Sequence, residues 1–141
     1  DYPAVNTNYA SVKDVMSSPA SKDTERIALV DDLLAYFSDD FKDKSGNDAK
    51  EKIQTTTLDY LKQYSLSSYK FSPINKDKDE VGHNYNETTG ILTVRTLIQA
   101  VANSGSMTIN VDKVFDIEWK LSGSNWVIVG GFPTTKAELG L

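Results

Sequence analysis

Residues 91–132 read ILTVRTLIQAVANSGSMTINVDKVFDIEWKLSGSNWVIVGGF. Apolar and polar side chains alternate along most of this stretch, which is the period of a strand with one buried face. Two clusters of turn residues, Ser104-Gly105 and residues 122–125, divide the stretch into three strands. The sequence therefore predicts an antiparallel meander whose strands are joined by short turns.

The two turns predict which residues face each other. A two-residue turn at Ser104 and Gly105 pairs four apolar couples: Ala100–Ile109, Ile98–Val111, Val94–Phe115 and Leu92–Ile117. A four-residue loop at 122–125 adds two more couples: Leu121–Trp126 and Trp119–Ile128. Opposed residues share one side of a sheet, so both hairpins place these side chains on the same face. That face requires a covering layer.

The opposite face of the predicted sheet is mixed. It carries polar and charged residues with valines among them: Thr93, Arg95, Gln99, Val114, Asp116, Glu118, Lys120, Val127 and Val129. Asp112-Lys113 places a charge on the apolar side instead. We expect a β-bulge there, because a bulge re-aims side chains and bends the strand.

Helical periodicity precedes the meander. Residues 8–18 predict a short helix with a narrow apolar stripe that docks loosely, and residues 21–43 predict the main helix over the sheet. Residues 48–64 predict a further helix. Residues 68–74 predict an edge strand, since Pro73 cannot donate to a ladder. The charge run at 75–80 and the polar residues 81–89 are expected to form loops.

Helices lead and strands follow, which indicates an α+β fold. We expect N-terminal helices packed on a bent, antiparallel, four-stranded sheet. The chain has 141 residues, which suits one domain. The expected division is a linker and short helix at 1–20, the α+β domain at 21–133 and a flexible tail at 134–141.

Composition narrows the possible functions. The net charge of −5 disfavours a surface that binds duplex DNA. The chain has no cysteine, which excludes disulfides and thiolate metal sites, and its one histidine, His83, is expected on a surface loop rather than as a catalytic base or metal ligand. No apolar run approaches the roughly 20 residues of a membrane span. Because the chain opens on Asp1, we expect a piece of a longer protein, compatible with an upstream anchor.

The element order and the closing hairpin, Trp119-Lys-Leu followed by Trp126-Val-Ile-Val-Gly-Gly, resemble the nuclear transport factor 2-like (cystatin-like) superfamily over about residues 21–132. This resemblance implies a cone-shaped fold. Within the superfamily, the chain resembles the extracytoplasmic domain of the bitopic scaffold subunit of type IV secretion systems, Gram-positive conjugative type. Three features carry the likeness: the extra short helix, the polar surface without a catalytic set, and an N-terminus that we expect to continue from an upstream segment. The Asn-Pro-x-Gly turn of the Gram-negative members is absent.

The resemblance implies a non-enzymatic scaffold of a conjugative DNA-transfer machine. Such a domain lies on the cell-wall side of the membrane, anchored through a segment missing from this chain. Its partners are other copies of itself, trimers in many Gram-positive elements, and other secretion subunits; no cofactor, metal or direct DNA contact is implied. We expect the contact surface at Thr93, Arg95, Gln99, Val127 and Val129, since interspersed valines suit a subunit contact of moderate polarity.

The alternative is a pocket-bearing member of the same superfamily, either a small-molecule binder or an isomerase- or dehydratase-like enzyme. Asp116 or Glu118 would then act with a tyrosine, because adjacent carboxylates raise each other's pKa. Cross-strand pairing with Arg95 and its neighbours explains these acids without catalysis. Tyr36, Tyr60 and Tyr64 are expected to ring the core between helices and sheet, with their hydroxyls at the rim, and a pocket lined by tyrosines is the alternative. An open cavity containing a carboxylate would favour this alternative, and a filled cone would favour the scaffold.

Overall fold

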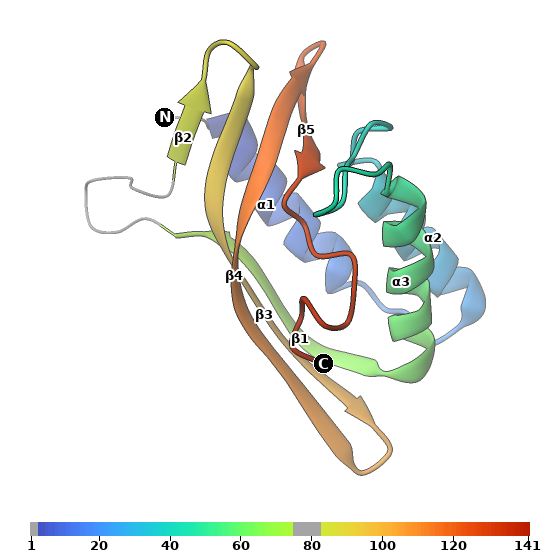
Figure 1. Cartoon of the computed structure of the whole chain (residues 1–141). Helices are drawn as coiled ribbons and strands as arrows, with labels where there is room; N and C mark the ends of the chain where they lie inside the picture. The colour runs from blue at the N-terminus through green and yellow to red at the C-terminus, as the bar shows by residue number, and fades with distance from the viewer. Residues whose placement is uncertain (1–2, 75–82) are drawn as a thin grey trace.

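The computed structural model describes residues 3–74 and 83–141. The elements are three helices, α1 (Pro3–Met16), α2 (Asp23–Leu34) and α3 (Lys50–Gln63), and five strands, β1 (Ser65–Pro73), β2 (His83–Asn86), β3 (Ile91–Ser104), β4 (Met107–Ser122) and β5 (Asn125–Gly130). Figure 1 shows the helices on one side of a curved sheet. The predicted α+β fold is confirmed, and the described residues form five strands rather than the expected four. The charge run at 75–80 lies outside the described residues.

The sheet is antiparallel throughout, in the order β1-β3-β4-β5. β2 and β1 both pair with the edge of β3 that faces away from β4: β2 pairs with residues 91–94, and β1 pairs with residues 96–103. β1 is therefore an edge strand, as Pro73 predicts. The expected loop at 81–89 is wrong where β2 forms, and the backbone of His83 lies opposite Val94.

The first hairpin of the meander differs from the predicted pairing by two residues. Ser104 faces Met107, so the turn is Gly105-Ser106, and Ala100 faces Val111 rather than Ile109. Since side chains alternate with a period of two, this shift leaves the buried face unchanged. In the second hairpin, the predicted pairings of Leu121 with Trp126 and of Trp119 with Ile128 are confirmed.

The expected bulge at Asp112-Lys113 is wrong. β3 and β4 pair without interruption there, with Lys113 opposite Ile98, and β4 shifts register only against β5, between Glu118 and Trp119. β5 does not pair with this part of β4. Lys113 can therefore keep an exposed ammonium beyond the strand edge without a bulge.

The helix α1 is part of the core, so the expected loose docking is wrong. Val5, Tyr9 and Val12 are each almost fully buried. Trp119 Nε1 donates to Tyr9 Oη at 3.1 Å, and Tyr9 Oη lies 2.5 Å from Thr96 Oγ1. Thr96 Oγ1 donates in turn to the Val94 carbonyl at 3.0 Å. Burial raises the pKa of Tyr9 to about 12, so its hydroxyl stays protonated and donates to Thr96.

The main helix is shorter than the predicted 21–43. α2 ends at Leu34, and the following residues run beside β5, where Ile128 donates to Tyr36 O at 2.8 Å and accepts from Ser38 N at 2.9 Å. Phe37 and Phe41, which lie within the range predicted to be helical, are buried, but they come from this non-helical segment. α3 begins at Lys50 rather than at residue 48.

Residues 134–141, which were expected to form a flexible tail, instead fold back as a turn on the helix side of the sheet (Figure 1). Thr134 is only 5% exposed, and Leu139 packs against the core. Glu138 Oε1 accepts hydrogen bonds from Thr134 Oγ1 at 3.1 Å and Thr135 Oγ1 at 3.2 Å. The chain enters this segment through Gly131, which has a positive φ of 79°.

Candidate functional site

An apolar cavity of about 120 Å³ lies between α3, the inner face of the sheet and the C-terminal segment. Apolar groups from all three dominate its wall: Ile53 and Leu61 of α3, Leu66 of β1, Ile98 of β3, Ile109 and Val111 of β4, and Phe132, Leu139 and Leu141 of the C-terminal segment. α2, which the sequence predicted as the main helix over the sheet, contributes only Leu33. No charged side chain lines the cavity in the described part of the chain.

Two tyrosine hydroxyls in the cavity wall lack hydrogen-bond partners. Tyr60 Oη is buried without a partner, and Tyr69, which is 8% exposed, makes no hydrogen bond to any described residue. Burial raises the pKa of both phenols, and the nearby Tyr64 adds to the rise at Tyr60. Both hydroxyls are therefore protonated donors at neutral pH. A buried hydroxyl without a partner costs about 1–3 kcal/mol.

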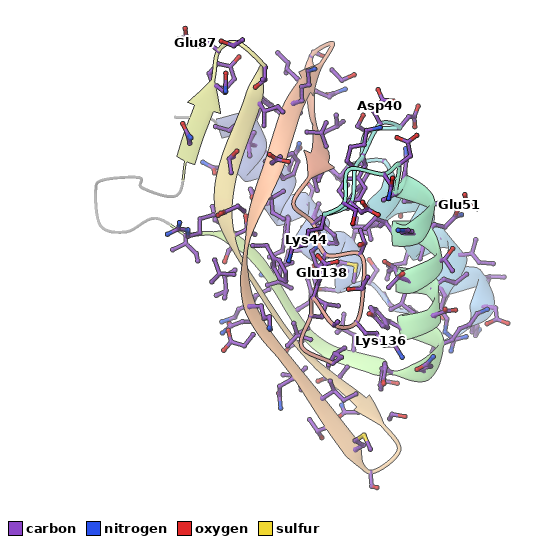
Figure 2. The ribbon with its side chains drawn as sticks, in the orientation of Figure 1. Asp40, Lys44, Glu51, Glu87, Lys136 and Glu138 are labelled. Carbon is purple, nitrogen blue, oxygen red and sulfur yellow. The ribbon has the colours of Figure 1, made fainter. Side chains whose placement is uncertain are left out.

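The rim beside Tyr60 is positively charged. Lys136 Nζ lies 5.9 Å from the centre of the Tyr60 ring. Figure 2 shows Lys136 on the C-terminal segment, on the side toward α3. The segment thus contributes apolar side chains to the wall and a cation to the rim of one cavity.

The predicted catalytic alternatives, Asp116 and Glu118, do not line this cavity. Arg95 lies opposite Asp116 across the strands, and its Nε is 3.6 Å from Asp116 Oδ1, the cross-strand pairing that the sequence suggested. Asp116 instead borders an open groove beside β4, together with Lys44 and Glu138, which Figure 2 shows close to each other.

The predicted contact residues share the outer face of the sheet, which no helix covers (Figure 1). Thr93, Arg95 and Gln99 come from β3, and Val127 and Val129 come from β5. All except Arg95 are partly buried within the chain itself. The structure brings these residues to one face, and the contact itself stays a prediction.

The described residues hold no group of three or more histidine, cysteine, aspartate or glutamate side chains that could bind a metal ion. Separately, none of the helices in the described ranges is long and apolar enough to cross a membrane.

The sequence indicates that some of the cavity residues face the core, but it does not indicate that two of their hydroxyls lack hydrogen-bond partners. Tyr60 was expected at the rim of the core, and Tyr69 belongs to the inward face of the predicted edge strand. Their apolar spacing was the available signal. The missing hydrogen-bond partners depend on which other groups come within reach, and no pattern of spacing reports this.

No family model and no curated protein matches the sequence. Two solved structures share its architecture. One is a protein named Rd1NTF2_05 with five substitutions, at 15% identity and a TM-score of 0.50 over 89% of this chain and 92% of that chain. The other is a proposed scytalone dehydratase from Novosphingobium aromaticivorans DSM 12444, at 9% identity and a TM-score of 0.54 over 92% of this chain and 85% of that chain.

These likenesses define the class: the chain has the α+β fold of nuclear transport factor 2-like proteins. Identities this low show the fold alone. Folds of this kind host enzymes as well as proteins without catalytic activity, so function has to be argued from the site.

Proposed function

We propose that the cavity binds a small, largely apolar molecule and that the protein is a ligand-binding domain. The observation that carries the proposal is Tyr60 Oη, a buried hydroxyl without a partner in the wall of an apolar cavity. An apolar cavity of about 150 Å³ is sufficient to bind benzene. The cavity here, about 120 Å³, suits a molecule near that size.

The two unpartnered hydroxyls specify one polar feature of this ligand. Tyr60 and Tyr69 both present protonated phenols, so a hydrogen-bond acceptor such as a carbonyl oxygen would satisfy at least one of them. A carboxylate buried among these apolar side chains would incur a large desolvation cost, because Lys136 lies at the rim beside the Tyr60 ring and not in the wall itself. The proposed ligand is therefore neutral, with a hydrocarbon body and one acceptor.

The proposal is for binding and includes no reaction. The groups lining the cavity in the described residues are apolar side chains and hydroxyls, whereas Asp116 is paired with Arg95 on the outer face. The likeness to a proposed scytalone dehydratase shows a shared fold and says nothing about turnover.

Cyclohexanone and methylenecyclohexane test the proposal as a matched pair, since they differ in a carbonyl oxygen against a methylene. We expect both to perturb the NMR signals of cavity residues, and cyclohexanone to bind more tightly. One neutral hydrogen bond contributes about 0.5–1.5 kcal/mol, so Tyr60→Phe should weaken cyclohexanone binding about 2- to 13-fold and leave methylenecyclohexane unaffected.

The control is Tyr36→Phe, because Tyr36 does not line the cavity. This variant should bind both compounds like the parent chain. If neither compound shifts a cavity resonance at millimolar concentration, the proposed function is wrong. If each compound binds Tyr60→Phe with the same affinity as the parent chain, the cavity is still a ligand site, but the Tyr60 hydroxyl does not contribute to its selectivity.

A second function, the homo-oligomeric scaffold of a conjugative type IV secretion machine, is favoured by the uncovered outer face of the sheet. Val114 on that face is 51% exposed, and Val127 and Val129 are only partly covered. In this second proposal the domain lies on the cell-wall side of the membrane, held by a segment outside this chain, and contacts copies of itself and other secretion subunits.

The double substitution Val127→Lys and Val129→Lys tests this contact. Two ammonium groups cannot be buried without partners, so we expect the molar mass measured by light scattering to fall to that of the monomer while the melting temperature changes little. Ile27→Lys, at a residue of α2 that is 52% exposed, is the control and should keep the parent mass. A parent chain that is monomeric at every concentration, or an unchanged mass in the double variant, contradicts the contact.

A further inference from the structure

The strand β4 has a long free edge on the side away from β3. β5 pairs with β4 only from Glu118 to Ser122, and no described residue makes a backbone hydrogen bond to the outer side of 107–115. The free stretch begins at the Gly105-Ser106 turn. It ends where Gly131 approaches Asp116 so closely that an added Cβ would lie 1.9 Å from Asp116 O.

That close approach also shows which backbone groups point outward. Asp116 O faces Gly131, on the side away from β3. In an antiparallel ladder, successive residues direct their N–H and C=O groups to opposite sides. The residues of the free stretch with the same parity as Asp116 therefore present unpaired N–H and C=O groups outward: Thr108, Asn110, Asp112 and Val114.

We propose that this edge pairs with the same edge of a second copy of the chain, antiparallel about a two-fold axis at Val111. An axis perpendicular to the sheet keeps both apolar faces on one side, and it pairs only residues of equal parity. With the axis at Val111, Asn110 pairs with the partner's Asp112, and Thr108 pairs with the partner's Val114. All four outward-facing residues of each copy then have partners.

Charge disfavours the registers on the C-terminal side of this one, and the turn disfavours the neighbouring register on the other side, because an axis at Asn110 would set Val114 opposite the partner's Ser106, a turn residue, rather than opposite a strand residue. An axis at Asp112 would oppose that carboxylate to its own copy, and an axis at Lys113 would oppose two ammonium groups, both of which are unfavourable. With the axis at Val111, the partner's Asn110 faces Asp112, and the partner's Ile109 faces Lys113. No like charges are opposed in this register.

The apolar residues of the edge fit the same arrangement. Met107 is 62% exposed in the single chain and would lie opposite the partner's Phe115. Val111 would lie opposite the partner's Val111. Both Val111 and Ile109 also line the cavity within the single chain. A free edge of this length that carries exposed apolar side chains is a template for strand pairing.

Asn110→Pro tests the pairing, because proline removes an N–H that the single chain does not use. We expect the parent chain to form a dimer in sedimentation equilibrium and Asn110→Pro to dimerise at least tenfold more weakly. Asn110→Ala keeps the N–H and should dimerise like the parent. The two proposed contacts predict opposite results for Val127→Lys with Val129→Lys: pairing through this edge keeps that variant dimeric, whereas a contact through the outer face makes it monomeric. A monomeric parent, or equal dissociation constants for the proline and alanine variants, overturns the proposal.

A cross-linking measurement does not depend on the proline variant folding. The chain has no cysteine, so Val111→Cys introduces a single thiol. At the proposed axis the two Cα atoms form a non-hydrogen-bonded pair about 4.5 Å apart, within the range that a disulfide spans. We expect Val111→Cys to form a disulfide-linked dimer under mild oxidation. Lys113→Cys should not, because its copies lie four residues, about 14 Å, apart along the strands at a rise of about 3.4 Å per residue. Equal cross-linking of the two variants, or none in Val111→Cys, contradicts the register.

Discussion

Gly131→Ala is expected to lower the free energy of unfolding by at least about 3 kcal/mol, because two penalties coincide. The φ of 79° lies in the left-handed region, which costs a residue with a Cβ about 1–2 kcal/mol. The added Cβ would also lie 1.9 Å from Asp116 O and 2.9 Å from Asp116 C. These are backbone atoms of a paired strand, so relief requires β4 or the C-terminal segment to move. Urea denaturation followed by circular dichroism measures the loss.

Gly105→Ala and Gly123→Ala are the matched controls for this change. Both glycines have positive φ, 61° and 63°, but neither has an atom within 4 Å of an added Cβ. Each should lose only the conformational part, about 1–2 kcal/mol. Three equal losses would show that the contact with Asp116 is unimportant. Because Gly131 leads into Phe132 and the rest of the cavity wall, its variant should also bind cyclohexanone more weakly than the controls do.

The meander shows what alternation can and cannot specify. Alternation assigned Leu92, Ile117 and Trp119 to one face, and all three are buried there. It could not decide between a turn at Ser104-Gly105 and one at Gly105-Ser106, since both keep the apolar side chains together. The choice depends on the conformation of the turn residues, which polarity does not report.

The end of the main helix was mispredicted for a different reason. Phe37 and Phe41 continue the helical spacing of α2 and are buried, yet their backbone runs beside β5. Apolar spacing records which side chains face the core. It does not record whether the N–H and C=O groups bond within a helix or to a distant strand such as β5. Here the tertiary partner overrides the local pattern.

The candidate site likewise has some features that the sequence predicts and others that it does not. The sequence predicted that Arg95 shares a face with Asp116, but its register set Arg95 opposite Val114; the structure places Arg95 opposite Asp116, with 3.6 Å between Arg95 Nε and Asp116 Oδ1. The inward direction of Tyr69 followed from alternation along β1. The cavity itself did not follow, because a void results from the combined shapes of α3, the sheet and the C-terminal segment. Whether the hydroxyl of Tyr60 finds a partner depends on that same combination.

Tyr9→Phe is expected to destabilise the protein by about 2–3 kcal/mol, a large loss for the removal of one oxygen atom. The ring would still stack on Phe71, with 4.6 Å between centroids, so the hydrophobic contact survives. Trp119 Nε1, in a fully buried side chain, would lose its acceptor, and Thr96 Oγ1 would lose its donor. The cost is therefore the desolvation of groups left unpaired in the core.

A double-mutant cycle separates this network from a general effect of the site. Thr96→Val removes the acceptor of the Tyr9 hydroxyl, and in Tyr9→Phe with Thr96→Val both partners are absent. We expect the double variant to be less destabilised than the sum of the single variants by about 0.5–1.5 kcal/mol. Tyr36→Phe should stay within about 0.5 kcal/mol of the parent, because the Tyr36 hydroxyl has no hydrogen bond to a described residue. Strict additivity would mean that Tyr9 and Thr96 act independently. A loss at Tyr9→Phe no larger than at Tyr36→Phe would mean that the hydroxyl does not hold α1 to the sheet.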